Sequence, residues 1–346
     1  MSAPIVCFVS ARLGEPDGVS MAAAAWMMAF ERLGFVVRTI AGEGEADCLV
    51  PGLALDATIP PSPGDLEAGF KDAGLVVVEN LCSLPLNLAA GMVVADCLRG
   101  RRAILHHHDF PWQRRGFEDL GPWPPDDPNW AHVTINEMSR RQLSERGIEG
   151  TTVYNGVLPA VPGDRKRARA VLGVAPDRIV LVQPTRAIPR KNVPAGIRLA
   201  EALEAIYWLT GPAEDGYGPE LERVLAAARC EILRGLPEGV DIADAYEASD
   251  AVVFPSTWEG FGLPLIESAQ YRKPLAVGWF PIVDELAAFG FQWFPSDDPV
   301  PLRTWLEHPD PELLERNHDL AVQHFSVEAL ADRLAAVLHQ AGWATW

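Results

Sequence analysis

Residues Val252–Val277 read VVFPSTWEGFGLPLIESAQYRKPLAV and indicate how the surrounding chain folds. The stretch opens with an apolar run ending at Phe254, which is short enough for a buried parallel strand. A loop with two glycines follows, and Pro264 then suits the first turn of a helix because its missing N–H would be unpaired there. Leu275 begins a second apolar run directly after Pro274. We therefore expect a strand–loop–helix–strand unit of a parallel α/β sheet.

The glycine-bearing loop has the chemistry of a phosphate and sugar site. It leads into a helix N-terminus, where free N–H groups and the positive dipole end bind phosphate. Two carboxylates bracket the loop, Glu259 within it and Glu267 in the first helical turn, and they can accept from sugar or ribose hydroxyls. A structural interpretation stays open. Gly260 and Gly262 permit a tight turn, and Glu267 complements the helix dipole, which is worth about 0.3–1 kcal/mol.

The full string resembles the E-x7-E signature of retaining GT-B glycosyltransferases of the group 1, or GT4-like, family. In that family the first Glu contacts the donor sugar, the loop amides meet the sugar and the diphosphate, and the second Glu holds the ribose hydroxyls. The resemblance implies donor contacts for Glu259, Gly260, Phe261, Gly262, Leu263 and Glu267. It also implies a catalytic role for Glu259.

Length and charge narrow the class of protein. At 346 residues the chain is too long for one ordinary core and suits two domains of about 150 residues each. Its net charge of −18 argues against nucleic-acid binding, which needs a basic surface to replace phosphate counterions. It argues equally against nonspecific attachment to anionic membranes.

Cysteine usage and hydropathy predict the compartment. The five cysteines are scattered and show no zinc-site or redox spacing, so we expect buried, reduced thiols. The N-terminus lacks the basic region of a signal peptide, and no stretch reaches about 18 apolar residues, the length that spans a bilayer. We therefore expect a soluble, cytoplasmic protein.

The N-terminal segment predicts a βαβ start. Residues 5–10 suit a strand, and residues 21–32 suit a helix that Ser20 would cap. The loop between them resembles the DGVS variant of the first strand–helix loop in the same family, which implies an acceptor contact for Asp17 and a donor contact for Gly18. The alternative is a helix cap followed by a turn glycine.

Three histidines and an aspartate, His106-His107-His108-Asp109, end another predicted strand. Ligands bind at such strand ends in open parallel sheets. Adjacent strand residues point to opposite faces, so all three histidines do not easily ligate one ion, and we expect no metal. The stretch resembles the His-Asp motif of the family, in which a histidine lies near the donor sugar. The resemblance implies His107 or His108 as the catalytic histidine.

A long loop, residues 111–130, follows that motif and carries three tryptophans and two adjacent arginines. Indole rings stack on sugar faces, and arginine pairs with carboxylate or phosphate. We expect this loop to hold the acceptor through Trp112, Arg114 and Arg115, with Trp123 and Trp130 nearby. The alternative is a surface excursion held by its aromatic residues, in which the arginines pair with Glu118 and Asp119.

The second half supplies basic residues. Arg186 and Lys191 resemble the family's paired basic residues, written G-R-x4-K-G, although Thr185 and Asn192 replace the two glycines. The resemblance implies that both bind the donor diphosphate and act in catalysis. It also places Arg234 where the family seats the nucleotide base.

Residues 165–169 form a further basic cluster, RKRAR. We expect a solvated helix face, with contact to anionic lipid as the alternative.

Alternating strands and helices predict two doubly wound, Rossmann-like domains facing across a cleft, the GT-B fold. We expect an acceptor-side domain at 1–157, a nucleotide-sugar domain at 158–324, and a helix at 325–346 packing toward the first domain. The predicted activity is transfer of a hexosyl group from a UDP- or GDP-sugar to a small polar or acidic acceptor, without metal or cofactor. Alternatives are a nucleotide-sugar epimerase of the same fold and a non-catalytic sugar-binding protein.

Overall fold

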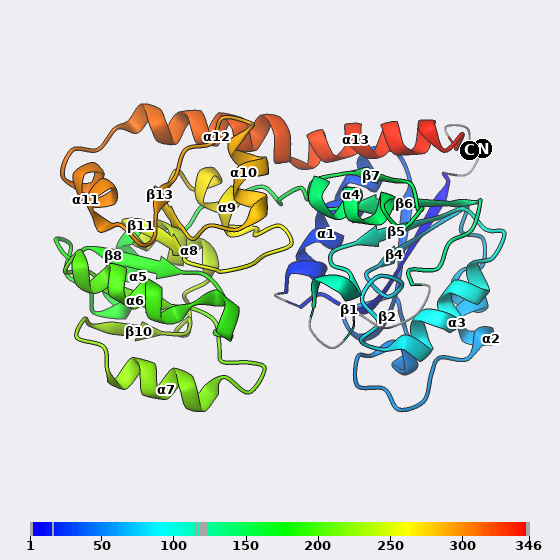
Figure 1. Ribbon diagram of the computed structural model, residues 1–346, viewed down its shortest axis with the longest axis horizontal. Helices are drawn as coiled ribbons and strands as arrows, with labels where there is room; N and C mark the ends of the chain where they lie inside the picture. The colour runs from blue at the N-terminus through cyan, green and yellow to red at the C-terminus, as the bar shows by residue number, and fades with distance from the viewer. Residues whose placement is uncertain (1–2, 16, 115–116, 118–122, 344–346) are drawn as a thin grey trace. The chain divides into compact units, whose positions relative to one another are not determined.

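The computed structural model describes residues 3–15, 17–114, 117 and 123–343. The chain forms two compact units, one of residues 1–158 with 324–346 and the other of residues 159–323 (Figure 1). Each unit is built around its own parallel sheet, so the structure confirms the predicted pair of doubly wound α/β domains.

The first unit contains a seven-stranded sheet in the order β3-β2-β1-β4-β5-β6-β7, with all neighbouring strands parallel. The chain changes direction across the sheet between β1 and β4, which is the topological switch point. The strands are β1 Ile5–Leu13, β2 Val36–Gly44, β3 Cys48–Leu49, β4 Leu75–Glu79, β5 Ala103–His107, β6 Trp130–Thr134 and β7 Gly150–Thr152. The helices are α1 Gly18–Arg32, α2 Pro63–Gly69, α3 Leu88–Leu98, α4 Glu137–Ser144 and α13 Val327–Gln340, with short 3-10 helices η1 Pro51–Leu53 and η2 Pro111–Gln113.

Both faces of this sheet are buried because alternate strand residues pack against different helices. Val6 and Phe8 of β1 join α1 and α13 in one apolar core. Cys7 and Val9 join α2 and α3 in a second core on the opposite face. Burial on two sides explains why the strands read as continuous apolar runs.

The last helix, α13, packs against α1 within the first unit. Leu330 and Leu334 share an apolar core with Trp26 and Phe30 of α1. Ser326 caps the helix, its hydroxyl oxygen accepting from the N–H of Ala329 at 3.2 Å. The amphipathic spacing of the terminal segment therefore reflects a real packing face.

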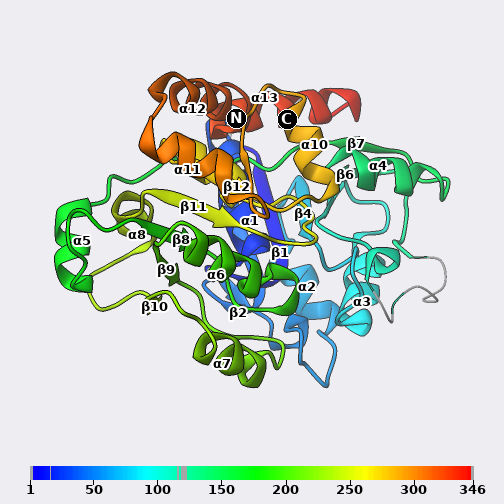
Figure 2. The same cartoon turned by 60° about the vertical axis from the view of Figure 1, so that its left-hand side comes forward.

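The second unit contains a six-stranded sheet in the order β10-β9-β8-β11-β12-β13, again parallel throughout. Figure 2 shows β10, β9, β8 and β11 side by side in that order, and the switch point lies between β8 and β11. The strands are β8 Val180–Gln183, β9 Ile206–Leu209, β10 Ile232–Arg234, β11 Ala251–Phe254, β12 Leu275–Val277 and β13 Phe294–Pro295. The helices are α5 Arg165–Leu172, α6 Val193–Ala202, α7 Gly218–Ala226, α8 Ile242–Ala248, α9 Pro264–Gln270, α10 Pro281–Ala287, α11 Pro299–Glu307 and α12 Pro311–Phe325, with the short η3 Pro189–Lys191. Residues 252–277 form the unit β11–loop–α9–β12, as predicted.

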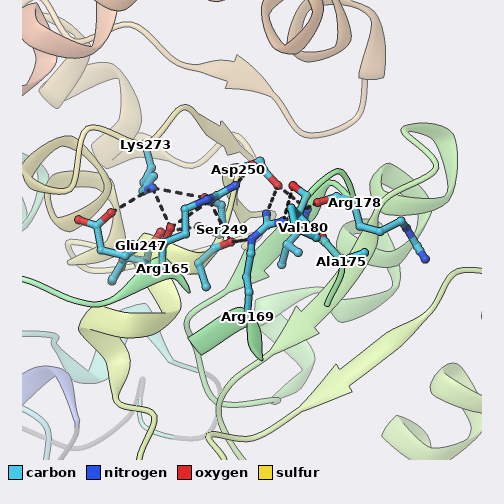
Figure 3. A network of polar contacts seen from close by, with 12 residues as sticks. Arg165, Arg169, Ala175, Arg178, Val180, Glu247, Ser249, Asp250 and Lys273 are labelled. Atoms are coloured by element: carbon cyan, nitrogen blue, oxygen red, sulfur yellow. Dashed lines mark hydrogen bonds and ion pairs between the residues drawn. The ribbon is translucent and has the colours of Figure 1, made fainter. Parts of the chain in front are cut away.

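The basic cluster on α5 is a solvated helix face only in part, because Lys166 and Arg167 are exposed whereas Arg169 is buried. Arg169 is only 5% exposed, and its guanidinium lies 2.6 Å from Oδ2 of Asp250. Arg165 binds the other oxygen, Oδ1 of Asp250, also at 2.6 Å (Figure 3). Both arginines also donate to backbone carbonyls, including that of Ala248. The cluster therefore fastens α5 to the segment between α8 and β11.

Two smaller expectations were also wrong. Helix α1 begins at Gly18 rather than Met21, and its cap is Asp17 rather than Ser20. Cys48 is exposed on the edge strand β3, whereas we expected buried thiols. In the described ranges, no helix combines the length and the apolar character needed to cross a bilayer.

Candidate functional site

The carboxyl ends of β8 and β11 bring together the predicted charged residues of the second unit. Lys191 ends the short helix η3 beyond β8, and Glu259 lies in the loop after β11. Their side chains meet, with Lys191 Nζ 2.6 Å from Glu259 Oε1. Arg190 pairs with the other oxygen, Oε2, of the same carboxylate. Two cations and one anion thus leave the cluster with a net positive charge at the switch point of the sheet.

Burial and pairing act against each other in this cluster. Burial raises the pKa of Glu259, but Lys191 and Arg190 outweigh it and lower that pKa below its ordinary value. Burial lowers the pKa of Lys191, and the Glu259 carboxylate opposes that change. The pair is only 9% and 6% exposed, so its attraction is weakly screened by solvent.

Arg186 lies beside the same cluster. Burial and the charge of Arg190 lower the pKa of Lys191, and the charge of Arg186 lowers it further. Its guanidinium Nη1 is 2.5 Å from Oε2 of Glu214, and both side chains are about one-third exposed. The predicted pair Arg186 and Lys191 is therefore brought together, with Glu214 as an additional partner.

Glu267 lies half-buried in the first turn of α9, near Lys191. Burial raises its pKa, while a hydrogen bond from Tyr246 and the charge of Lys191 oppose the rise. The Tyr246 hydroxyl donates to Glu267 Oε2 at 2.7 Å. Tyr246 in turn stacks on Tyr271, with ring centroids 4.6 Å apart. The carboxylate is therefore fixed in orientation by an aromatic pair.

The loop between Glu259 and α9 requires glycine at one position. Gly262 has a φ of +88°, and an added Cβ would lie 2.9 Å from the ring of Phe254. The neighbouring Phe261 is 3% exposed, and Leu263 is the residue that precedes α9. Helix α9 is only seven residues long, which limits the dipole at its N-terminus.

Arg234 is not brought to this cluster. It ends the edge strand β10, which β9 and β8 separate from β11. Its guanidinium pairs with Glu222 at 2.8 Å, and both side chains are exposed. The expected contact of Arg234 with a nucleotide base stays a prediction.

In the first unit, Glu79 joins His106 and His108 in a buried cluster. Glu79 ends β4 and is paired in register with His106 of β5. Its Oε2 lies 2.8 Å from His106 Nδ1 and 2.9 Å from His108 Nε2. Two histidines and a carboxylate can hold a transition metal, and the three ligand atoms lie within 4.8 Å of one another. This arrangement was not predicted from the sequence, in which Glu79 stands 27 residues before His106.

His107, one of the two histidines predicted as catalytic, lies on the opposite face of the sheet from this cluster. Its Nδ1 is 2.6 Å from the Ser83 hydroxyl, and its Nε2 is 2.9 Å from His132 Nδ1. Burial lowers the pKa of His107 and of His132, which favours neutral rings. With both nitrogens bonded inside the protein, His107 has the environment of a structural histidine, and the predicted role is left to His108.

Asp17 serves as a helix cap, the alternative left open by the sequence. Its Oδ1 accepts from the N–H of Val19 at 2.9 Å and from that of Ser20 at 3.2 Å, and Arg12 pairs with Oδ2 at 3.1 Å. An added Cβ at Gly18 would meet no described atom within 4 Å, so packing does not demand glycine there.

The tryptophans of the predicted acceptor loop are packing residues. The Arg146 guanidinium lies 3.6 Å from the Trp112 ring centroid, and Phe110 stacks at 4.5 Å. Two groups at these distances do not fit on one face of the ring, so both faces of Trp112 are covered. Trp130 is buried in β6, and Trp123 donates its N–H to the Ser83 carbonyl. The expected stacking of a sugar on Trp112 is therefore contradicted.

Arg114 pairs with Asp109, the aspartate that follows the histidines, and its side chain is 42% exposed. Arg115 lies outside the described residues, as do Glu118 and Asp119, its possible partners.

Four residues near these sites were missed by the sequence analysis: Glu79, Asn80, Arg190 and Tyr246. Asn80 accepts from the backbone N–H of His108 and donates to Asp109, each at 3.0 Å. The sequence could have indicated Glu79 and Asn80, because they end a predicted strand and the carboxyl ends of neighbouring parallel strands meet at one sheet edge. Nothing in the sequence identified Tyr246, which reaches Glu267 from a different helix.

Comparison with known proteins identifies the class. Residues 164–294 match the family model described as Glycosyl transferases group 1. The chain is 26% identical over 332 residues to the mannosylglucosylglycerate synthase of Thermotoga maritima, covering 78% of this chain and 77% of that protein. It is 34% identical over 139 residues to the D-inositol 3-phosphate glycosyltransferase of Actinosynnema mirum, covering 35% of this chain and 33% of that one.

Solved structures give the same fold. Anabaena HepE in complex with UDP-glucose superposes with a TM-score of 0.73 at 18% identity, covering 97% of this chain and 99% of that one. The sucrose-phosphate synthase of Thermosynechococcus elongatus gives 0.71 at 14% identity, covering 99% and 100%. The protein is therefore a glycosyltransferase with the GT-B fold. The match to the group 1 glycosyltransferase model includes residues 252–277, the stretch whose signature predicted the resemblance.

Proposed function

We propose that the protein transfers a hexosyl group from a UDP- or GDP-sugar to a small, acidic acceptor, with retention of anomeric configuration and without a metal ion. The observation that carries this proposal is the cluster of Lys191, Arg190 and Glu259 at the switch point of the second sheet, with Arg186 and Glu267 beside it. It offers cations for a diphosphate and carboxylates for sugar and ribose hydroxyls within one site.

The donor chemistry follows from these charges. Transfer builds positive charge at the anomeric carbon and negative charge on the leaving diphosphate. Arg186 and Lys191 stabilise the diphosphate as it leaves. Both are held in place before the reaction, and charges that need no rearrangement during the reaction stabilise a leaving group most effectively. Glu259 accepts from hydroxyls of the sugar, and Glu267 accepts from those of the ribose. The diphosphate takes the acceptor proton on the face from which it departs, which gives retention.

The acceptor is proposed to be small and anionic. The names of two relatives contain such compounds, glycerate in mannosylglucosylglycerate synthase and inositol phosphate in D-inositol 3-phosphate glycosyltransferase. Arg114 supports the proposal because its guanidinium is partly exposed beside the His-Asp motif. Trp112 contributes packing to this region rather than a sugar platform.

Parallel calorimetric titrations with UDP-glucose, GDP-mannose and UDP-GlcNAc, followed by a product assay with glycerate and inositol phosphate, test the function. We expect one nucleotide sugar to bind and one glycoside to form. Interconversion of the nucleotide sugar without an acceptor would identify an epimerase. Sugar binding without turnover would identify a binding protein, and either result would contradict the proposal.

A further inference from the structure

Gln183 is the last residue of β8, and its side chain is completely buried. Its amide nitrogen Nε2 donates to the carbonyl of Lys191 at 3.0 Å and to the hydroxyl of Thr185 at 3.2 Å. Its amide oxygen Oε1 accepts from the hydroxyl of Tyr207 at 2.6 Å. A buried amide is costly unless its polar atoms are hydrogen-bonded, and here the nitrogen and the oxygen both have partners.

These partners determine which way the amide of Gln183 points. The carbonyl oxygen of Lys191 can only accept, so the amide nitrogen must face it. The amide oxygen then faces Tyr207. Burial raises the pKa of the Tyr207 phenol well above its ordinary value, so the hydroxyl keeps its proton and donates. Tyr207 of β9 therefore holds the amide in the orientation that bonds the main chain of Lys191.

The contact between Gln183 and Tyr207 depends on Gly196 in α6. An added Cβ at Gly196 would lie 2.8 Å from Oε1 of Gln183 and 2.8 Å from Cε2 of Tyr207. Real Cβ atoms do not approach other atoms so closely, so a larger residue would push both side chains away. The amide of Gln183 is thus fixed by three elements, β8, β9 and α6.

The main chain around the two adjacent cations, Arg190 and Lys191, is held on each side. The carbonyl of Arg190 accepts from the N–H of Thr257 at 2.9 Å, and that of Lys191 accepts from Gln183. Asn192 follows with a φ of +52°, in the left-handed region that Asn tolerates better than most residues. Groups held in place before binding lose little further freedom when a ligand arrives.

We propose that Gln183 is a positioning residue for the donor diphosphate. By holding the carbonyl of Lys191, it keeps the ammonium group of Lys191 where that group can bind the diphosphate. Gln183 has no exposed surface, so it acts through Lys191 rather than on the ligand. This inference rests on the proposed function, because it takes the donor diphosphate as the ligand of Lys191.

The competing explanation is that Gln183 only supports the fold, and Asn317 offers the comparison. Asn317 lies on α12 in the same unit and is 4% exposed. Its amide donates to the carbonyl of Gln292 at 2.8 Å and accepts from the N–H of Gln292 at 3.1 Å. It is therefore also a buried amide that holds a main chain, but it holds the segment before the edge strand β13.

Isothermal titration of UDP and GDP into the full-length protein, with urea unfolding of each variant, tests the proposal. The variants are Gln183→Leu, Lys191→Met, their double variant, and Asn317→Leu as the matched control. We expect Gln183→Leu to weaken binding of the nucleoside diphosphate about tenfold. We expect Asn317→Leu to leave that affinity unchanged, although both changes lower the free energy of unfolding.

The double variant distinguishes positioning from general support of the fold. If Gln183 acts through Lys191, the Gln183→Leu change causes no further loss of affinity in the Lys191→Met background. Losses that multiply in the double variant would overturn the proposal. So would wild-type affinity in a folded Gln183→Leu protein, or an equal loss of affinity in Asn317→Leu.

Gly196→Ala is the second variant, and it decides the question if Gln183→Leu does not fold. The added methyl group displaces the amide of Gln183 without leaving a cavity, and alanine favours a helix more than glycine does. We expect Gly196→Ala to bind the nucleoside diphosphate more weakly than wild type does. Wild-type affinity in this variant would overturn the proposal.

Failure of the proposed function gives a different result. A wild-type protein that binds neither UDP nor GDP contradicts the function, and this inference with it. A wild-type protein that binds one of them, with Gln183→Leu and Gly196→Ala binding it equally well, contradicts only this inference.

Discussion

The ammonium group of Lys191 lies 2.6 Å from Oε1 of Glu259, and both side chains are almost fully buried. Arg190 binds the second oxygen of that carboxylate, so each oxygen of Glu259 is paired with a cation. The arrangement holds two functional charges ready in the absence of substrate, at the cost of burying them. It also means that changing either residue leaves the other with an altered environment.

Replacing Lys191 with Met, or Arg186 with Ala, should weaken nucleoside diphosphate binding by about 1.5–3 kcal/mol, the scale of a hydrogen bond to a charged group. Isothermal titration measures this directly. Arg229→Ala is the matched control, because Arg229 is 84% exposed and pairs with Glu201 away from the loop that follows β11. Unchanged affinity in both site variants would show that neither side chain binds the diphosphate.

Transfer activity should survive treatment with EDTA. The second unit offers Arg186, Arg190 and Lys191 as cations for the diphosphate, so the reaction does not need an added metal ion to neutralise the leaving group. The measurement is the rate before and after chelation, with manganese added back. Loss of activity that manganese restores would contradict the prediction and direct attention to Glu79, His106 and His108.

A double change of Arg114 and Arg115 to Ala should raise the Michaelis constant for an anionic acceptor and leave hydrolysis of the donor unchanged. Arg114 pairs with Asp109, so removal also frees that carboxylate to repel an anion. Transfer and donor hydrolysis are assayed separately. If the Michaelis constant and both rates match wild type, this segment plays only a structural part.

The sequence predicted the helices and strands well, together with the residues at the ends of the strands, because these depend on the pattern of neighbouring residues. The unit β11–loop–α9–β12 follows from apolar runs, two glycines and Pro264, all within one short stretch. Contacts between distant residues were harder to predict. Asp250 lies 81 residues from Arg169, and the sequence contains no pattern that links them. Tyr246 is 21 residues from Glu267 on a different helix, and it was missed for the same reason.

The ion network on α5 gives a stability prediction. Asp250→Asn should destabilise the fold by about 3 kcal/mol, because Arg169 is buried and loses its carboxylate partner while Arg165 loses its own. Glu231→Gln is the control, since its pair with Arg178 is half-exposed and worth at most about 1 kcal/mol. Urea unfolding measures both. Equal effects in the two variants would mean that burial of Arg169 adds nothing to the pair.

Glu267 should make stability depend on pH in a direction opposite to most acidic groups. Burial raises its pKa above the ordinary 4.5, so the folded state holds this proton more tightly than the unfolded state does. Its contribution to the free energy of unfolding is therefore full below pH 4.5 and is lost as the pH rises through the folded-state pKa. Gln resembles the protonated acid and does not titrate. Glu267→Gln should consequently match wild type in stability at acidic pH and exceed it increasingly toward neutral pH.

The same variant should bind nucleotide more weakly, because an amide offers one acceptor oxygen where the carboxylate offers two. Urea unfolding across the pH range, with nucleotide titration at neutral pH, measures both effects.

Tyr246→Phe is the companion variant. It removes the 2.7 Å hydrogen bond that holds the pKa of Glu267 down. The loss of stability begins near the ordinary pKa in both proteins, but in Tyr246→Phe it should continue to a higher pH and be larger than in wild type. If the unfolding free energies of wild type and Glu267→Gln change with pH in parallel, the ionised carboxylate of Glu267 does not destabilise the fold, and the prediction is contradicted.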